Sequence, residues 1–405
     1  MNNGPMRIVT LTSLFPNRAQ PSNGIFVANR LAKLLASGEV ESRVVAPIPW
    51  YPLARLVPGE AGRHIGAPRS ADWNGVPVRY PRFFRPPKIG MTMAPYSMAR
   101  AVRPVITEIL RGGYDFDLID AHYFYPDGVA AAILAKHFGK PLVITARGTD
   151  LNLIPAHAIP RRLICRAADT ADGLITVCAA LREVLLDLGV SGDKVRVLRN
   201  GVDLETFVPT DRAAARAALG LHRPTLLSVG HLVVRKGNEI TIAALADLPD
   251  HELLIVGDGP EEESLRRLAR SSGVADRVRF LGRKGHDELP ALYAAADALV
   301  LASSREGWAN VLLEAMACGT PVVASDVWGT PEVVAAPEAG LLMAERTPGA
   351  LAGAVRRLFA ALPDRAATRR YAEGFSWDDT TRGQITLFRR ILAERGGANK
   401  EETKV

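Results

Sequence analysis

Short apolar runs alternate with amphipathic stretches along almost the whole chain. Runs of four to six residues rich in Val, Ile and Leu predict β-strands that are buried on both faces. In the stretches between them, apolar residues recur every three or four positions, which predicts helices with one buried face. The predicted strands are 7–12, 42–46, 76–80, 118–121, 142–145, 173–177, 195–198, 225–229, 252–256, 278–281, 298–302, 321–324 and 340–343. The clearest predicted helices are 26–36, 129–137, 179–188 and 261–271.

This alternation predicts an α/β fold. Strands separated by helices form parallel sheets with crossover connections, and the strands fall into one series before residue 200 and a second series after it. A chain of 405 residues is long enough for two such domains, each with its own core. The turn-rich segment 200–224 is the expected boundary, and residues 377–394 predict a final amphipathic helix.

The composition is that of a soluble globular protein. Hydrophobic residues make up 48% and charged residues 23% of the sequence, and the apolar runs are too short to span a membrane. The first apolar run has neither a basic start nor a cleavage site, so it is interpreted as a strand rather than a signal peptide. Cys165, Cys178 and Cys318 lack metal-ligand spacing, which predicts free thiols in a reducing cytoplasmic compartment.

The net charge of +7 is unevenly distributed. Residues 1–200 carry 25 Lys and Arg against 15 Asp and Glu, whereas residues 201–405 carry 25 against 28. A basic first half favours an anionic partner. Its densest patch, 79–88, mixes arginines with aromatic residues. Two interpretations stay open: peripheral contact with anionic lipids at the inner face of a membrane, or a solvated loop with Phe83 or Phe84 buried against the domain.

Residues 303–325, SSREGWANVLLEAMACGTPVVAS, carry the most informative pattern. Glu306 follows a predicted strand, and Glu314 lies eight positions later inside a helix that Asn310 begins. A carboxylate within an apolar helix is costly to bury without partners, and a pair of ribose hydroxyls would satisfy it. The N–H groups at the helix start favour a phosphate. The pattern therefore suits a sugar nucleotide, with the sugar at Glu306, the diphosphate at the helix start and the ribose at Glu314.

This segment resembles the E-x7-E motif of retaining glycosyltransferases of family four, enzymes with the two-domain GT-B fold. Spacing alone favours an ordinary strand, loop and helix with two surface glutamates, but the surrounding string EG-x3-VLLEAMACGTPVVAS favours the family. The resemblance implies two Rossmann-like domains that face each other across a cleft. The donor-binding residues that it implies here are Glu306, Gly307, Trp308, Ala309, Asn310, Val311 and Glu314.

Two further segments resemble the family near the predicted domain boundaries. RNGVDLETFVP is similar to the segment that closes the first domain of the family, and FSWD is similar to the segment before its last helix, which crosses back onto that domain. The resemblance implies an acceptor-side domain over residues 1–205, a nucleotide-sugar donor domain over 206–376 and a returning helix over 377–394. Residues 395–405 are polar and are expected to be disordered.

The loop after the first strand of the second series carries further donor candidates. Residues 230–237, GHLVVRKG, resemble the family loop G-R-L-x3-K-G, whose basic pair neutralises the donor diphosphate. Lys236 takes the place of the lysine, His231 replaces the arginine, and Arg235 would supply the missing charge. Without a bound anion, Lys236 would be a solvated residue at a helix start, where a cation opposes the helix dipole.

Gly257 and Arg283 follow the next two strands. The resemblance implies that Gly257 lines the nucleotide and that Arg283 makes backbone contacts near the base. Taken alone, residues 256–260, VGDGP, are a generic turn.

The first domain contributes the loop after its first strand. Gly24 matches the glycine of the family's first loop, where a glycine at a helix start lets the backbone approach a phosphate, and Asn23 and Phe26 beside it are acceptor candidates. The segment is not a G-x-G-x-x-G fingerprint, which argues against a nicotinamide-dependent dehydrogenase. His122 lies at the end of another strand, in a segment that resembles the family's H-x-H-W segment, and is interpreted either as a cleft residue or as a buried structural histidine.

Arg147 marks a departure from the family. Many relatives have a histidine here that bonds the donor sugar, whereas ARGTDLN resembles a subgroup linked to cell-wall and exopolysaccharide assembly, including a teichuronic-acid glycosyltransferase. Guanidinium stays protonated, so Arg147 cannot act as a base, but it would stabilise the departing phosphate or hold a sugar hydroxyl. Asp150 and Asn152 then become candidates for acceptor contact.

No metal is expected. Asp115 and Asp117 form a nominal D-x-D, with which other glycosyltransferases hold a metal and a diphosphate, but the pair precedes a strand and so lies at the wrong end for a ligand. The implied mechanism is front-face: the acceptor hydroxyl attacks from the side of the leaving phosphate, which takes the proton, so catalysis depends on positioning and charge stabilisation. The catalytic residues are expected to be Glu306, Lys236, Arg147 and His122.

Together these features predict a cytoplasmic, metal-independent enzyme that moves a sugar with retention from a UDP- or GDP-linked donor to a sugar or lipid-linked sugar, in polysaccharide or glycolipid biosynthesis. No cofactor besides the donor substrate and no nucleic-acid partner are expected. Two alternatives stay open. One is a GT-B nucleotide-sugar 2-epimerase, which would convert the donor without an acceptor. The other is a non-catalytic basic protein that binds a polyanionic surface.

Overall fold

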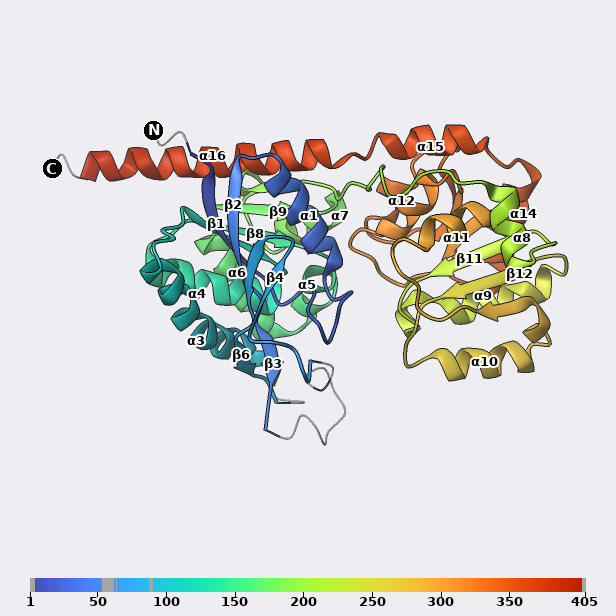
Figure 1. The fold of residues 1–405 in the computed structure, drawn as a ribbon, viewed down its shortest axis with the longest axis horizontal. Coiled ribbons are helices and arrows are strands. Elements are labelled where there is room, and N and C mark those ends of the chain that lie inside the picture. Colours follow the sequence, from blue (N-terminus) through green and yellow to red (C-terminus); the bar gives the residue numbers. More distant parts are fainter. Residues whose placement is uncertain (1–3, 53–61, 63, 87–89, 403–405) are drawn as a thin grey trace. The chain divides into compact units, whose positions relative to one another are not determined.

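The computed structural model describes residues 4–52, 62, 64–86 and 90–402 (Figure 1). The contacts between residues group the chain into two compact units. The first unit combines Met1–Leu198 with Asp378–Val405, and the second unit is the continuous segment Arg199–Trp377. Two successive crossings of the chain, at residues 198–199 and 377–378, therefore connect them.

The first unit contains an eight-stranded sheet with the strand order β10-β9-β8-β7-β1-β2-β5-β4. Only the pairing of β4 with β5 is antiparallel. Strand β1 pairs with both β2 and β7, so the loops after β1 and β7 lie beside each other where the strand order reverses. The strands are β1 (Met6–Leu11), β2 (Val40–Val45), β4 (Ser70–Trp73), β5 (Val76–Arg79), β7 (Leu118–His122), β8 (Leu142–Ala146), β9 (Gly173–Thr176) and β10 (Val195–Val197). The helices are α1 (Ile25–Ala36), α3 (Gly90–Arg111), α4 (Val129–Phe138), α5 (Thr149–Asn152), α6 (Ala158–Thr170), α7 (Ala179–Asp187) and α16 (Trp377–Glu402).

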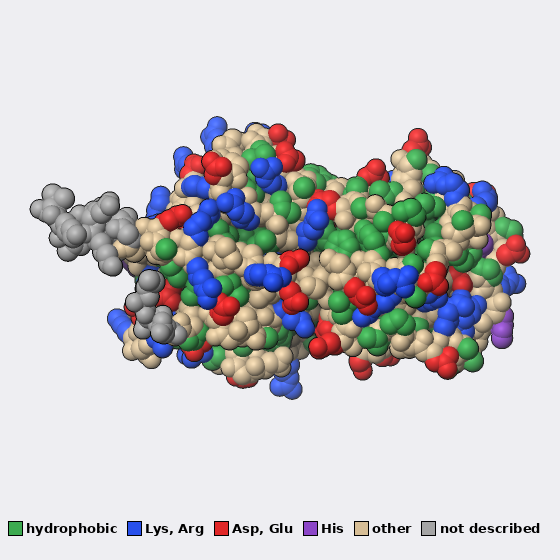
Figure 2. Space-filling view, turned by 90° about the horizontal axis from the view of Figure 1, so that it is seen from above, with side chains coloured by type: hydrophobic (Ala, Val, Ile, Leu, Met, Phe, Trp, Pro, Cys, Tyr) green, Lys and Arg blue, Asp and Glu red, His purple; other side chains and the backbone are tan. Residues whose placement is uncertain are grey.

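Helix α16 completes the core of the first unit. Its Phe388 and Ile391 are buried in a cluster with Ile8 and Val143 of the sheet. Burying one such side chain contributes about 1.5–3 kcal/mol to stability. On the side of the molecule seen in Figure 2, Lys and Arg are interspersed with Asp and Glu, as expected where the polar face of an amphipathic helix meets solvent. The helix continues beyond residue 394, where the sequence predicted its end.

The apolar pattern does not predict three short strands: β3 (Ile48–Trp50), β4 and β6 (Arg82–Phe84). Strands β3 and β6 form a separate two-stranded parallel sheet, so residues 82–84 are a strand rather than the expected loop. Phe83 is buried, whereas Phe84 is 46% exposed. Pro87 and Lys88 of the same basic patch lie outside the described residues.

The second unit is built on one six-stranded parallel sheet with the order β13-β12-β11-β14-β15-β16. Strand β11 lies between β12 and β14, so the strand order reverses there, and sheets of this kind bind ligands outside the carboxyl ends at that point. The strands are β11 (Thr225–Val229), β12 (Glu252–Val256), β13 (Val278–Phe280), β14 (Ala298–Leu301), β15 (Val322–Ser325) and β16 (Gly340–Met343). The helices are α8 (Arg212–Leu219), α9 (Asn238–Ala244), α10 (Glu262–Ser271), α11 (Leu289–Ala295), α12 (Asn310–Ala317), α13 (Thr330–Val333), α14 (Pro348–Ala360) and α15 (Arg365–Glu373).

The prediction of two α/β units with doubly wound parallel sheets is confirmed. In the part of the chain that the structure describes, no helix is both long enough and apolar enough to cross a membrane.

Candidate functional site

The reversal point of the second sheet brings Lys236 and Glu306 into direct contact. The loop after β11 carries Arg235 and Lys236, and the loop after β14 carries Ser303 and Glu306. Lys236 Nζ donates to Glu306 Oε1 at 2.6 Å, and Ser303 Oγ donates to the same oxygen at 2.7 Å. Arg235 completes the group with its guanidinium 3.6 Å from Glu306 Oε1. Two residues that the sequence separates by seventy positions, Lys236 and Glu306, thus form one ion pair, as their strand-end positions favour.

Glu306 stays ionised although it is only 8% exposed. Burial alone would raise its pKa, but the charges of Lys236 and Arg235, with the hydrogen bonds from Lys236 and Ser303, hold the pKa below the ordinary value. One carboxylate faces two cations here, so the group keeps a net positive charge. Such a group attracts a further anion.

Gly237 fixes the geometry of this loop. Its φ of 71° lies in the left-handed region, and a Cβ added to it would lie 2.0 Å from the carbonyl oxygen of Ala302. A side chain at this position would therefore separate α9 from the end of β14. The close approach explains why a glycine follows Lys236, and it holds the lysine beside Glu306.

The start of α12 lies next to Glu306 in the chain. Gly307, Trp308 and Ala309 are buried, and Asn310 is the first residue of the helix. The sequence suggested that Asn310 caps the helix, but its side-chain oxygen instead accepts a hydrogen bond from Asn200 Nδ2 at 3.3 Å, and no side chain caps α12. Because the first N–H groups of a helix have no partner within it, this uncapped start is suited to an anion.

Glu314 lies four residues after Asn310 on α12, and the partly exposed Val311 lies between these two residues. Tyr293 of α11 donates its hydroxyl to Glu314 Oε2 at 2.8 Å. Burial raises the pKa of Glu314 to about 7, against the lowering effect of the Tyr293 hydrogen bond. Among the described residues, no donor reaches Oε1, so this oxygen is left to accept a hydroxyl from a ligand.

The other predicted donor residues of this unit lie on loops after neighbouring strands. His231 is exposed, and its Nδ1 donates to the carbonyl oxygen of Asp258 at 2.5 Å, so its ring is held by the next loop rather than by Glu306. Gly257 has a φ of 138°, and a Cβ there would lie 1.9 Å from Gly230 O. Arg283 follows β13 and is exposed. The structure does not bring these three residues into contact with the Lys236–Glu306 pair.

In the first unit, His122 and Arg147 come together at the ends of β7 and β8. Arg147 donates from an η nitrogen to His122 Nδ1 at 2.7 Å, and His122 Nε2 lies 3.2 Å from Asp120 Oδ2. The guanidinium carbon of Arg147 lies 5.7 Å from the ring centre of Phe26, on α1. His122 is therefore a buried histidine that contacts Arg147, and a role for it in a ligand-binding cleft stays a prediction.

His122 is neutral in this arrangement. Burial lowers its pKa to about 4, Asp120 opposes that shift, and the Arg147 guanidinium adds to it. Arg147 can only donate, so Nδ1 of the histidine must accept and the proton must reside on Nε2, which donates to Asp120.

Two predicted acceptor residues have internal contacts. Asp150 is fully buried and accepts backbone N–H groups of Phe124, Arg147 and Gly148 at 2.6–3.1 Å. Asn23 donates to the carbonyl oxygens of Ser13 and Phe15. These bonds organise the loops around Arg147, whereas contact of Asp150 and Asn23 with an acceptor stays a prediction.

Gly24 and Asn152 belong to the same loops. Gly24 has a φ of 63°, and a Cβ there would lie 2.1 Å from Leu14 C, so a glycine is required where α1 begins. Asn152 Oδ1 is buried and has no hydrogen-bond partner among the described residues.

Sequence reasoning missed several polar residues beside these groups. Asp127 accepts the backbone N–H and the hydroxyl of Ser13 and so joins the loop after β1 to the loop after β7. Burial raises the pKa of Asp127 to about 7. Ser303 and Tyr293, described above, lack a local motif as well. For Asp127, Ser303 and Tyr293, the only local signal of a functional position was a polar residue within an otherwise apolar strand end or helix.

Both carboxylates of the nominal D-x-D have partners within the first unit. Asp115 Oδ1 pairs with Lys140 at 2.6 Å, and Asp117 accepts the backbone N–H of Arg7 at 2.7 Å. Both residues precede β7, at the opposite end of the strand from His122.

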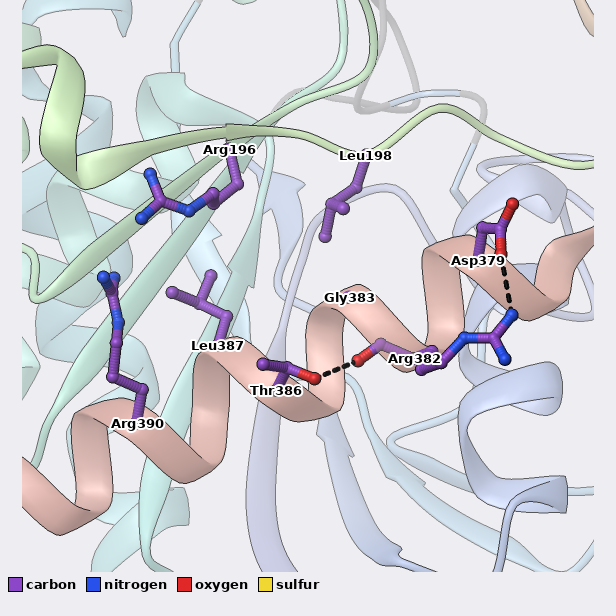
Figure 3. Close-up of a pocket in the computed structure, with 8 residues that line it drawn as sticks. All are labelled: Arg196, Leu198, Asp379, Arg382, Gly383, Thr386, Leu387 and Arg390. Atoms are coloured by element: carbon purple, nitrogen blue, oxygen red, sulfur yellow. Dashed lines mark hydrogen bonds and ion pairs between the residues drawn. The ribbon is translucent and has the colours of Figure 1, made fainter.

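A separate pocket of about 430 Å³ opens between β10 and the first half of α16 (Figure 3). It is lined by Arg196, Leu198, Asp379, Arg382, Gly383, Thr386, Leu387 and Arg390. Arg382 pairs with Asp379 at 2.7 Å, so the charge of one of the arginines that line the pocket is offset. None of the predicted site residues lines this pocket.

Two family models match the chain, one on each side of residue 206. The model described as Glycosyltransferase Family 4 matches residues 26–206. The model described as Glycosyl transferases group 1 matches residues 211–375.

Known proteins are similar over most of the chain. The D-inositol 3-phosphate glycosyltransferase of Mycolicibacterium gilvum is 31% identical over 426 residues, which cover 98% of this chain and 92% of that protein. The enzyme of the same name from Acidothermus cellulolyticus is 36% identical over 310 residues, which cover 69% of this chain and 68% of that protein.

Solved structures share the fold. Sucrose-phosphate synthase from Thermosynechococcus elongatus gives a TM-score of 0.77 at 23% identity, covering 96% of this chain and 100% of its own. HepE from Anabaena, solved in complex with UDP, gives 0.70 at 21% identity, covering 97% of this chain and 100% of its own.

Proposed function

This chain belongs to glycosyltransferase family four and is a glycosyltransferase that uses a nucleotide sugar, and from that premise we propose that it retains the anomeric configuration of the sugar and takes a uridine diphosphate donor. One observation carries the proposal: the Lys236–Glu306–Ser303 group lies beside the uncapped start of α12. The UDP complex of the similar HepE supports the choice of base.

Each part of the donor has a partner in this proposal. The diphosphate binds Lys236, Arg235 and the N–H groups at the start of α12, because cations and a helix start both favour negative charge. Glu306 orients the sugar. The free Oε1 of Glu314 accepts a ribose hydroxyl, which gives the carboxylate a second donor.

The proposed retention does not require Glu306 to act as a nucleophile. Its Oε1 is held by a lysine and a serine, so it is a poor nucleophile towards the anomeric carbon. In the proposed front-face reaction, the acceptor oxygen forms the new bond as the bond to the diphosphate breaks, and the leaving phosphate takes the hydroxyl proton. Arg147 binds a phosphate or a sugar hydroxyl of the bound substrates. Catalysis then depends on positioning and charge stabilisation.

The proposed acceptor is a phosphorylated cyclic polyol of the inositol phosphate class. Similarity to the D-inositol 3-phosphate glycosyltransferase of M. gilvum over nearly the full length supports it. The excess of 25 basic over 15 acidic residues in the first 200 positions also favours an anionic acceptor.

Product analysis tests donor, acceptor and stereochemistry together. The purified enzyme is incubated with UDP-glucose, UDP-N-acetylglucosamine or GDP-mannose, with and without D-inositol 3-phosphate, and proton NMR follows the anomeric signal. A UDP-sugar that gives an α-linked product only with the acceptor supports the proposal. An inverted product, or conversion of the donor without an acceptor, overturns it; the latter would indicate an epimerase.

Replacement of Glu306 tests the carrying observation. The variant Glu306→Gln keeps the size of the side chain but removes the charge that pairs with Lys236, and we expect turnover to fall about a hundredfold or more. Glu288→Gln is the control, because Glu288 pairs with Lys284 on the exposed surface of the same unit. Turnover of Glu306→Gln within twofold of the control would contradict the assignment.

Metal independence is part of the proposal. Lys236, Arg235 and the α12 start supply the positive charge that a divalent ion would otherwise supply. Turnover in excess EDTA should therefore equal turnover with added Mg²⁺ or Mn²⁺, and a loss that Mn²⁺ restores would refute this part.

A peripheral membrane contact is proposed for the first unit, on the cytoplasmic side. Trp50 and Phe84 are paired in register on β3 and β6 and are 47% and 46% exposed. Ser97 of α3 donates to Phe84 O, which places Met93 and Tyr96, both more than half exposed, on the adjoining helix. Exposed aromatics with nearby arginines suit an anionic lipid surface. The three free cysteines support a reducing compartment.

Vesicle flotation tests this contact. The wild type should float with vesicles that contain phosphatidylglycerol and much less with pure phosphatidylcholine, and the double variant Trp50→Ser, Met93→Ser should lose the difference. Ile159→Ser is the control, since Ile159 is an exposed apolar residue elsewhere in the unit. Equal flotation of the double variant and this control would exclude the patch.

A further inference from the structure

A continuous line of buried side chains runs from α16 to Arg147. Arg30 of α1 donates from Nε to Gln384 Oε1 at 2.9 Å, and Gln384 donates from Nε2 to Asp120 Oδ2 at 2.9 Å. The same oxygen of Asp120 is 3.2 Å from His122 Nε2, and His122 Nδ1 accepts from Arg147 at 2.7 Å. All five residues are at most 8% exposed.

Every hydrogen bond in this line has one allowed direction. Both arginines can only donate, so Gln384 must present its oxygen to Arg30 and its nitrogen to Asp120. Likewise His122 must accept at Nδ1, carry its proton on Nε2 and donate it to Asp120. Reversal of any one member would therefore leave two donors or two acceptors facing each other in a buried setting, which is costly.

Gln384 is the neutral link between a buried cation and a buried anion. It lies on α16, 264 residues from Asp120 in the sequence. Without its amide, Arg30 would lose an acceptor and Asp120 would lose a donor. Asp120 would then be free to move towards Arg30, and the hydrogen bond that orients His122, and through it Arg147, would weaken.

We propose that Gln384 is a positioning residue for Arg147 and acts on it through Asp120 and His122. The proposal rests on the proposed function in one respect, namely that Arg147 contacts a bound substrate. Helix α16, which completes the core of the first unit, then also determines the geometry of the reacting groups. Misplacement of a substrate-binding group by about 1 Å can lower turnover about a hundredfold.

A double-mutant cycle tests this route. The variants are Gln384→Met, which keeps the side-chain volume but removes both hydrogen bonds, Arg147→Met, and the two combined. UDP release is measured from UDP-glucose with D-inositol 3-phosphate. Gln384→Met should lower kcat about tenfold to a hundredfold, with a smaller change in KM, and should lower it less than twofold further when Arg147 is already Met.

A purely structural role predicts a different outcome. Equal losses of kcat from Gln384→Met with and without Arg147 would overturn the proposal. Ile391→Ala controls for stability, because Ile391 is buried in the apolar core on the same helix and makes none of these hydrogen bonds. That variant should lower the melting temperature and leave the kcat of the folded enzyme unchanged. An Arg147→Met enzyme with normal kcat would instead refute the role of Arg147 in the proposed function, so the two failures are distinct.

A second readout does not depend on turnover. Nitrogen NMR of histidine-labelled protein should show the His122 ring with its proton on Nε2 in the wild type. In Gln384→Glu, which can still accept from Arg30 but repels Asp120, the His122 nitrogen signals should shift or broaden. Signals of His122 identical to the wild type in a folded Gln384 variant would overturn the proposed coupling, whether or not these substrates turn over.

Discussion

At the scale of single residues, the site separates two carboxylates by their surroundings. Glu306 has two cations beside it and keeps its charge. Glu314 has a tyrosine hydroxyl as its partner, and burial raises its pKa to about 7. One carboxylate is therefore set for electrostatic work at all physiological pH values, whereas the other gains its charge near neutrality and fits a role as a hydrogen-bond acceptor.

Lys236 should dominate the affinity for the donor. Lys236→Met removes a cation next to the proposed diphosphate position and leaves Glu306 with Arg235 and Ser303. We expect the dissociation constant of UDP to rise about tenfold to a hundredfold, because a charge-assisted hydrogen bond to the phosphate is lost. Isothermal titration with UDP measures this change. Lys284→Met, at an exposed pair in the same unit, is the control, and equal affinities would count against the assignment.

Glu314 should make UDP binding depend on pH. Ribose hydroxyls donate to the ionised carboxylate, so bound nucleotide favours deprotonation and lowers the pKa of Glu314 below its unliganded value of about 7. Affinity should be full above that pH and weaken as the pH falls below it, by up to about tenfold per pH unit. UDP itself titrates in this range, so the comparison is with Glu314→Gln. The variant should lack the additional loss, and parallel profiles would exclude a ribose contact.

At the scale of elements, close backbone contacts hold the site loops in place. Gly237 and Gly220 both have left-handed φ values, of 71° and 62°, but only Gly237 has a carbonyl oxygen where a Cβ would go. The pair therefore separates the cost of the conformation from the cost of the contact.

Alanine at these two glycines should have unequal effects. Gly220→Ala should lower the free energy of unfolding by about 1–2 kcal/mol, the cost of a left-handed residue. Gly237→Ala should lower it by more than about 3 kcal/mol and also weaken UDP binding, because α9 and the end of β14 must separate. Urea denaturation measures the first quantity and isothermal titration the second. Equal losses would show that the loop moves aside easily.

The sequence predicted the regular elements better than the directions of individual side chains. All thirteen predicted strands occur within two residues of their predicted ends, because strands buried on both faces carry a strong apolar signal. Strand β4 is missed because it has no buried position, and β3 and β6 because three residues are too short to show a pattern. Asp150 shows the other limit. Its position in a polar loop was clear, but the three backbone N–H groups that turn it inward come from the folded loop.

Long-range polar partners were beyond prediction for a related reason. The rule that ligands bind beyond the ends of strands placed both Lys236 and Glu306 at the donor, but it did not predict that they form an ion pair. Gln384 and Asp120 have no such rule, since Gln384 is one polar residue within an amphipathic helix whose docking site depends on the completed core.

At the scale of the whole molecule, one unit is continuous in sequence and the other is not. The second unit consists of Arg199–Trp377 alone, whereas the first unit needs α16, which follows that segment in the sequence. Removal of α16 would expose the sheet face that Phe388 and Ile391 cover.

The separated segments should therefore differ in behaviour. Residues 199–377 should fold alone, unfold cooperatively and bind UDP, since their core and the Lys236–Glu306 pair are complete. Residues 1–198 should be unstable or aggregate, and a covalent fusion of 378–405 through a flexible linker should restore cooperative unfolding. Circular dichroism melts and UDP titration measure both. A stable 1–198 segment would mean that α16 contributes little to the core.

The late position of α16 in the chain also matters while the protein is being made. At ribosomal rates of about 5–20 residues per second, the roughly 180 residues that intervene delay the arrival of this helix by roughly 10 to 35 seconds. During that time the nascent first unit has a bare apolar sheet face and an Asp120 that lacks its Gln384 partner, while the second unit can already fold. Chaperone capture of translation intermediates should thus peak before α16 leaves the exit tunnel.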